Sequence, residues 1–456
     1  MKKLTYVKIL SMAFILGSCN KALDLKPFQS IDQGHALLTS SDVQITLVGA
    51  YNKMSNGNLY GGNVYLQPDL MATQTVIDWS GTFQDLTQEV TQTIPINNAF
   101  VDSTWTTGYS VINSVNNVLS ALDKVDAADK DRVEGEAKFL RGMTYFDLAR
   151  MFGRSYNDGD PATNLAVPIV LTPTISVNAS SFVLRATVAQ VYLQAIADLT
   201  TAESKLPVDN SFYADQNSAS AILARLYLQK GDYANAAAEA NKVINSGKYQ
   251  LNANYADEFP YPGRSATHVD NTSEDIFAIQ FTAQTVTIFN FNGLNAEYAS
   301  ANDAGRGEIA IKQSFIDEFS ANDTRKGLFY DDSGSLRTDK FSNVYGNLHV
   351  IRLAELYLIR AEANLRTASA IGATPLNDVN QIRNRAGIAP LTAVTVNDVL
   401  TERRHELCFE GGFFLHDAKR TQQNVNGLPY NSPKLVWPIP ETEMNANPKL
   451  VQNPGY

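Results

Sequence analysis

The sequence predicts a mainly α-helical protein, in which about four tetratricopeptide-like helix pairs carry a second, irregular face of long loops and a few short strands. Three observations support this fold class. Amphipathic helical periodicity recurs between residues 43 and 386, and residues 219–247 follow the spacing of a tetratricopeptide repeat. The long stretches 56–101 and 248–307 lack helical periodicity.

Residues 1–18 have the layout of a secretory signal peptide. Three lysines and no acid precede an apolar run over residues 9–16, which is too short to span a bilayer. The run ends in Leu16-Gly17-Ser18-Cys19, which resembles the lipobox of bacterial lipoproteins. We therefore predict lipidation at Cys19, a mature chain over 19–456, and membrane attachment through the lipid alone. The alternative is an ordinary signal peptide with an accidental cysteine.

Charge and cysteine content narrow the class of protein. The formal net charge is −10, and it becomes −13 once the three lysines before Cys19 are removed. Such an acidic chain is a poor partner for a phosphate backbone, so we expect no nucleic-acid partner. Cys408 is the second of two cysteines, so a lipidated Cys19 leaves no intrachain disulfide.

Helical periodicity predicts the elements in chain order. Trp105, with Tyr109 and Ile112, lies on one face of a helix and is assigned to the core. In the repeat over 219–247, Gly231 ends the first helix, and small residues at Ala224 and Ala236 allow close approach. We expect four stacked pairs: 43–55 with 104–124, 132–152 with 187–204, 218–230 with 233–246, and 352–367 with 376–386.

The two stretches without helical periodicity are expected to face the ligand. Residues 56–101 are rich in Gly, Asn, Thr and Gln, and residues 248–307 contain only short β-like runs such as 275–281. Long loops in a compact protein are usually functional or disordered, and the aromatic content here argues against disorder. We expect one globular unit over 19–456, divided into helical repeats (43–247), an irregular ligand-side region (248–350) and C-terminal helices with a tail (351–456).

Motifs of catalysis and cofactor binding are scarce. The segment HELCFE (405–410) begins like a zinc-protease helix, but Phe409 stands where the second histidine belongs. Neither a GxSxG motif, a P-loop nor a CxxC motif occurs, and the other histidines fall in no ligand spacing. We therefore predict no catalytic residue, no metal and no cofactor. Arg403, Glu406 and Glu410 are expected to share one helical face and to form an ion-pair network with neighbouring helices.

Together these segments resemble one family over nearly the whole mature chain, the SusD/RagB-like outer-membrane lipoproteins of Gram-negative bacteria. The order of the matching segments is that of the family, and the last two are distinctive. They are the lipobox at Cys19, EAKFLRGMTYFDLARMFG, ATVAQVYLQAIADL, the repeat at 219–247, RLAELYLIRAEA, LNDVNQIRNRAG, TERRHELCFEGGFFLHDAKR and VWPIPETEMNANPKLVQNPGY.

The resemblance implies a surface-exposed outer-membrane lipoprotein that binds oligosaccharides. It also implies a partner, a SusC-like TonB-dependent β-barrel that takes up the ligand, and no chemistry on the ligand. Some relatives handle peptides, so a peptide receptor on the same scaffold is the first alternative. A lipid-anchored hydrolase is a second alternative, against which the absence of a catalytic motif counts.

The family's binding residues belong to no shared motif, so the ligand site is inferred from the chemistry of sugars. A sugar ring presents apolar C–H faces and a rim of hydroxyls, which suit flat aromatic side chains flanked by polar groups. Trp79, with Asp78 and Phe83, lies in an aperiodic polar stretch, whereas Trp437 belongs to the family-typical VWPIP and is assigned to packing. A second candidate group is Phe289, Phe291 and Tyr298. The alternative for each aromatic is packing against the lobe beneath it.

Overall fold

Capping residues define where the helices of the scaffold begin in the computed structural model, which describes residues 37–456 except 262–266 and 284–291. Reciprocal capping boxes open several helices, among them those with the pairs Thr39 and Asp42, Thr187 and Gln190, and Asp215 and Ser218. The first helix of the tetratricopeptide-like pair ends at Gly231, whose φ of +80° is the left-handed conformation that glycine adopts without strain.

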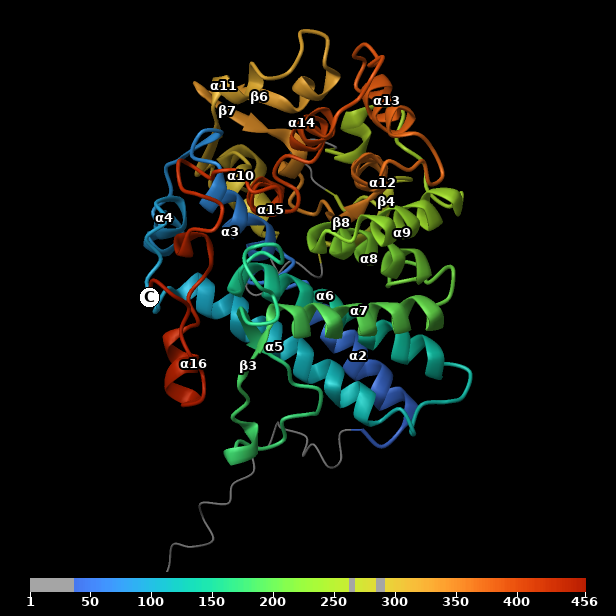
Figure 1. Ribbon diagram of the computed structural model, residues 1–456, viewed down its shortest axis with the longest axis vertical. Coiled ribbons are helices and arrows are strands. Elements are labelled where there is room, and N and C mark those ends of the chain that lie inside the picture. The colour runs from blue at the N-terminus through green and yellow to red at the C-terminus, as the bar shows by residue number, and fades with distance from the viewer. Residues whose placement is uncertain (1–36, 262–266, 284–291) are drawn as a thin grey trace, which may run out of the picture.

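The four predicted helix pairs are confirmed. They pack as α2 (Ser40–Met54) with α5 (Ala99–Ser120), α6 (Lys130–Phe152) with α7 (Val188–Lys205), α8 (Gln216–Lys230) with α9 (Tyr233–Asn245), and α12 (Leu353–Thr367) with α13 (Pro375–Arg385). Contacts of α5 with α6, α7 with α8, and α9 with α12 join the pairs into one stack, with α2, α5, α6 and α7 below α8, α9 and α12 in Figure 1. Stacking buries faces that a single pair would leave exposed.

Small residues set the spacing of the pairs. Ala224 of α8 and Ala236 of α9 are fully buried. A Cβ atom at Gly142 of α6 would lie 2.9 Å from Leu199 Cγ and 3.0 Å from the carbonyl oxygen of Ala195, both in α7. The α6–α7 distance therefore depends on the missing side chain at Gly142.

Four short antiparallel strand pairs belong to the irregular part of the chain. They are β1 (Ile77–Trp79) with β5 (Ile309–Ile311), β2 (Leu165–Pro168) with β3 (Arg185–Thr187), β4 (Asp275–Ile279) with β8 (Leu348–Arg352), and β6 (Phe329–Asp332) with β7 (Ser335–Thr338). In Figure 1, β6, β7 and the short helix α11 (Gln313–Ile316) lie at the end of the molecule opposite α2 and α5.

The prediction that residues 56–101 and 248–307 contain no helix is wrong. The first stretch holds α3 (Asn63–Ala72) and α4 (Gln84–Val90), and the second holds α10 (Gly293–Tyr298). Helix α3 is buried on nearly all sides, polar residues included, so it has no apolar stripe from which periodicity could predict it. Helices α4 and α10 have only 7 and 6 residues, too few for a periodic signal.

The C-terminal part adds α14 (Val396–Glu406), α15 (Phe413–Arg420) and α16 (Glu441–Ala446). The predicted ion-pair network exists, but not on one helical face, because α14 ends at Glu406 and Glu410 lies beyond it. Arg403 pairs with Asp417 of α15, with 2.9 Å between Nε and Oδ2. Glu406 and Glu410 both pair with Arg352 at the end of β8. The network thus joins the C-terminal helices to the strand region.

Trp105 and Trp437 are buried at 2% and 0% exposure, in line with their assignment to the core. The Trp437 indole N–H donates to the carboxylate of Glu89 at 2.9 Å, which ties the C-terminal tail to α4. In the ranges that the structure describes, no helix has both the length and the apolar character needed to cross a bilayer.

Candidate ligand-binding surface

Trp79 ends strand β1 rather than lying in an open loop, and it is only partly exposed. Its backbone pairs with Ile309 of β5, and its indole Nε1 donates to Thr87 Oγ1 at 2.9 Å. A Cβ atom at Gly81 would lie 2.1 Å from the indole ring, so the backbone at Gly81 covers part of the ring. The strand, the hydrogen bond and the covering backbone hold Trp79 in one orientation.

The side chains of Phe83 and Asp78, which are close to Trp79 in the sequence, are more exposed than that of Trp79. Phe83, just before α4, is 38% exposed and packs edge-to-face on Phe100 at a ring distance of 5.6 Å. The guanidinium carbon of Arg306 lies 4.4 Å from the centre of the Phe83 ring. The Asp78 side chain is 70% exposed and pairs with Lys312 at 3.2 Å. We call Asp78, Trp79, Phe83 and Arg306 the Trp79 surface.

A carboxyl pair lies behind Arg306. Burial, together with the hydrogen bond and the negative charge of Glu308, raises the pKa of Glu297 to about 8. Burial also acts to raise the pKa of Glu308, but hydrogen bonds from Arg306 and Glu297 outweigh it and lower that pKa. At neutral pH, Glu297 is therefore protonated and Glu308 ionised. The negative charge of Glu308 holds Arg306 beside the Phe83 ring.

The second predicted group of aromatics does not join this surface. Phe289 and Phe291 lie outside the described residues, as does Cys19. Tyr298 is 1% exposed, and its ring centre lies 5.3 Å from those of both Phe341 and Phe409. The structure thus corrects its proposed place in the site, because a side chain buried in the core cannot stack on a ligand at the surface.

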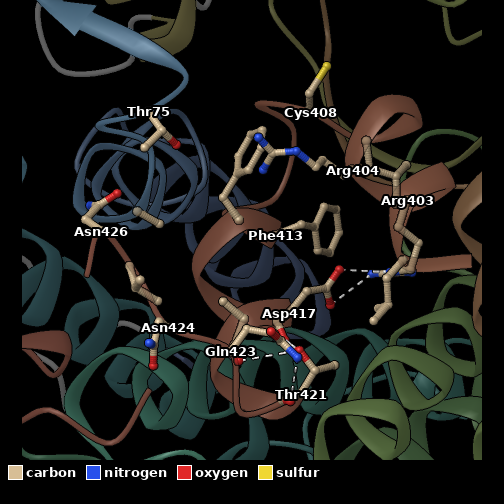
Figure 2. A pocket seen from close by; sticks show the side chains of 16 residues that line it. Thr75, Arg403, Arg404, Cys408, Phe413, Asp417, Thr421, Gln423, Asn424 and Asn426 are labelled. Atoms are coloured by element: carbon tan, nitrogen blue, oxygen red, sulfur yellow. Dashed lines mark hydrogen bonds and ion pairs between the residues drawn. The ribbon is translucent and has the colours of Figure 1, made fainter. Parts of the chain in front are cut away.

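A pocket that the sequence did not predict lies between α14, α15 and the C-terminal end of α3 (Figure 2). Its volume is about 260 Å³, and polar and aromatic side chains line it together, among them Arg403, Arg404, Phe414, Asn424 and Asn426. The Arg404 guanidinium lies 5.2 Å from the ring centre of Phe315 and 5.0 Å from that of Phe414. No motif marks Asn424 and Asn426, so only the fold brings them to the pocket.

The thiol that lines the pocket is poorly suited to covalent chemistry. Cys408 is its thiol, but burial raises the Cys408 pKa, so the group stays protonated and is a poor nucleophile. Arg403 and Asp417 neutralise each other by an ion pair, which Figure 2 shows along one wall. Aromatic rings next to amides and charged groups suit polar ligands with apolar faces.

A helix-pair scaffold that carries aromatic and polar surfaces suits a binding protein, and the comparisons with known proteins agree. Residues 22–228 match a family model described as "Starch-binding associating with outer membrane", and residues 329–428 and 415–456 match the model of the SusD family. The chain belongs to the SusD/RagB family of outer-membrane glycan-binding proteins. Members of this family are non-catalytic binding proteins, which confirms that the chain is not an enzyme and excludes the hydrolase alternative.

Relatives match over nearly the full chain at low identity. SusD-like protein P2 of Formosa agariphila is 24% identical over 493 aligned residues, covering 92% of this chain and 93% of that protein. A solved SusD superfamily protein from Bacteroides thetaiotaomicron has 26% identity and a TM-score of 0.81, covering 91% of this chain and all of that one. A SusD-like carbohydrate binding protein from Bacteroides vulgatus, at 21% identity, shares the fold, with a TM-score of 0.76 and coverage of 90% and 97%.

Proposed function

We propose that this protein is an outer-membrane lipoprotein, anchored through Cys19, that binds oligosaccharides on the Trp79 surface and delivers them to a SusC-like TonB-dependent barrel. Its membership of a glycan-binding family supports the ligand class, and the lipobox-like segment before Cys19 supports the anchor. The particular oligosaccharide, the barrel and the binding residues are parts of this proposal.

The observation that carries the site is the exposed ring of Phe83, with the Arg306 guanidinium 4.4 Å from its centre and Trp79 four residues before it in the chain. A sugar ring would place its C–H face on the aromatic rings. The Asp78 carboxylate, 70% exposed, and the Arg306 guanidinium would then meet the hydroxyls. Because strand pairing and a hydrogen bond hold Trp79 in place, little conformational entropy is lost on binding.

The proposal is tested by calorimetric titration of the mature protein with a panel of soluble oligosaccharides that includes maltooligosaccharides. Trp79→Ala and Phe83→Ala should each lower the affinity for the bound glycan. For Trp79→Ala we expect a loss of about 2 kcal/mol of binding free energy. Phe212→Ala is the matched control, because Phe212 is another exposed phenylalanine, 51% exposed, outside the Trp79 surface.

Two results would contradict the proposal. Equal affinity in wild type, Trp79→Ala and Phe83→Ala would move the site elsewhere, and the pocket of Figure 2 would be examined next through Phe414→Ala. Binding of peptides, with no response to any glycan in the panel, would favour the peptide receptor instead.

A further inference from the structure

Three side chains that are distant in the sequence converge in the interior. Glu258 ends the 3-10 turn Tyr255–Glu258, Asp275 begins β4, and His349 lies in β8. One carboxylate oxygen from each acid and a nitrogen of the imidazole all lie within 4.8 Å of one another. The side chains of the two acids are at most 1% exposed, and that of His349 is 7% exposed. The three donor atoms therefore face a point that solvent scarcely reaches.

Hydrogen bonding satisfies every oxygen of the two acids except one. Asp275 Oδ2 accepts from the backbone N–H of Thr272 at 2.8 Å, and Glu258 Oε2 accepts from Asn252 and Thr272. His349 Nδ1 bonds to Asp275 Oδ1 and lies 3.4 Å from Glu258 Oε1. A ring nitrogen carries at most one proton, so it can serve only one of the two carboxylates. Glu258 Oε1 is left without a hydrogen-bond partner in the described structure, which is costly for a buried polar atom.

The neighbouring arginine and lysine do not pair with Glu258 Oε1, because they form ion pairs with other acids. Arg352 pairs with Glu406 and Glu410, and Lys340 pairs with Glu410 at 2.6 Å. Burial acts to lower the pKa of His349, but the charges of Asp275 and Glu258 outweigh it and raise this pKa to about 9, while burial raises the pKa of Glu258. A metal ion would therefore displace protons as it binds, and the two carboxylates and neutral imidazole that remain carry a formal charge of −2, which a divalent cation would cancel. One such ion would also give the unpaired Glu258 oxygen a partner.

We propose that Glu258, Asp275 and His349 bind a divalent transition-metal ion, with Zn²⁺ as the best match. Imidazole nitrogen and carboxylate oxygen are both zinc ligands, with bonds of about 2.0–2.2 Å. A tetrahedral ion with such bonds separates its ligand atoms by about 3.4 Å. The separation of His349 Nδ1 and Glu258 Oε1 already has this value, whereas Asp275 Oδ1 is hydrogen-bonded to Nδ1 and would have to move away from it.

A fourth ligand has room beside the cluster. A cavity of about 20 Å³ is lined by Asp275, His349 and Thr272, among others. One water molecule needs roughly 10–15 Å³ in this measure, so a single metal-bound water fits. Three protein ligands and one water are also the ligand set of catalytic zinc sites, but solvent scarcely reaches these side chains, so the ion would have a structural role. It would fasten the segment that ends at Glu258 to the β4–β8 strand pair.

The test uses the mature protein, stripped with a chelator and titrated with ZnCl₂. We expect one zinc per chain by calorimetry and by elemental analysis, and a melting temperature that rises with free zinc. Glu258→Gln and His349→Ala should each weaken zinc binding at least tenfold and abolish the rise in melting temperature. His268→Ala is the control, because the His268 ring pairs with an exposed aspartate, Asp270, at 3.4 Å and should bind zinc only weakly.

Several outcomes would overturn the proposal. These are no binding at 100-fold excess of ZnCl₂, unchanged binding in both cluster variants, or binding of CaCl₂ in preference to ZnCl₂. Should the variants fail to fold, zinc-edge anomalous diffraction from wild-type crystals decides. A peak among the three side chains supports the site, and an ordered water without anomalous signal overturns it. Glycan binding plays no part in this test, so its outcome is independent of the proposed function.

Discussion

Arg352 and Glu406 form an ion pair in the interior, with 2.8 Å between Nη1 and Oε1 and with at most 1% of either side chain exposed. Arg325 Nη1 lies 3.2 Å from Oε2 of the same carboxylate. Arg385 pairs with Oε1, the oxygen that Arg352 also contacts. Burial acts to raise the pKa of Glu406, but the guanidinium groups of Arg385, Arg352 and Arg325 outweigh burial and hold this pKa far below its ordinary value. This carboxylate therefore balances cations from three separate segments.

Neutralising Glu406 should destabilise the fold strongly. Glu406→Gln leaves buried guanidinium charge uncompensated, so we expect the free energy of unfolding to fall by about 3–5 kcal/mol. The measurement is urea unfolding at pH 7. Glu318→Gln is the control, because the Glu318–Arg404 pair is more than one-third exposed on each side and should be worth less than about 1 kcal/mol. A similar cost for both variants would contradict the expectation.

The stability that the ion pairs of Glu406 contribute should be lost at acidic pH. Because the pKa of Glu406 is lower in the folded than in the unfolded chain, its stabilisation is fully present above the ordinary value of 4.5 and is lost as pH falls below it. The pKa values of Glu410 and Glu362 are lowered in the same direction, where paired arginines outweigh burial. Unfolding free energy measured from pH 7 down to pH 3 should fall for wild type and fall less for Glu406→Gln.

Glu297 should affect the pH dependence of stability in the opposite direction, lowering stability as pH rises. Its folded pKa of about 8 exceeds the ordinary 4.5, so the folded chain binds the extra proton and stability falls as pH rises between these values. Glu297→Gln keeps a donor toward Glu308 without a charge. It should therefore melt higher than wild type at pH 8.5 and almost equally at pH 5. A constant difference at both pH values would show that the carboxyl is not protonated in the folded chain.

The spacing of α8 and α9 should depend on the small side chain at Ala224, which is fully buried. Ala224→Leu would overpack this contact, and we expect a loss of about 1–3 kcal/mol of unfolding free energy. Ala197→Leu, on the exposed face of α7, is the matched control and should be nearly neutral. Equal denaturation midpoints for the two variants would contradict tight packing at Ala224.

Lipid attachment makes a separate prediction. If Cys19 carries the anchor, cells that express Cys19→Ala should produce a protein that incorporates no labelled palmitate and is released from membranes. Cys408→Ser serves as the control, because Cys408 is buried and its replacement should leave the labelling unchanged. Palmitate labelling that persists in Cys19→Ala would exclude the lipoprotein assignment.

Much of the scaffold could be predicted from the sequence, because its information is local. Apolar spacing within α5 places Trp105 in the core, and Gly231 marks a turn by its own backbone freedom. The family resemblance likewise rests on contiguous motifs. By contrast, α3 could not be predicted, because surrounding elements bury it on nearly all sides. Helical periodicity appears in a sequence only when one face of the helix is exposed to solvent and therefore polar.

Tertiary structure alone decided the sites. Trp79 and Tyr298 are both aromatic residues beside polar neighbours, yet one lies at a strand end near the surface and the other deep in the core. Asp275 and His349 meet because β4 pairs with β8, and tertiary contacts bring Glu258 to them from a separate 3-10 turn, with no common spacing in the sequence. Local physics determines which segments become helices, whereas the exposure and partners of a side chain depend on contacts between residues distant in the chain.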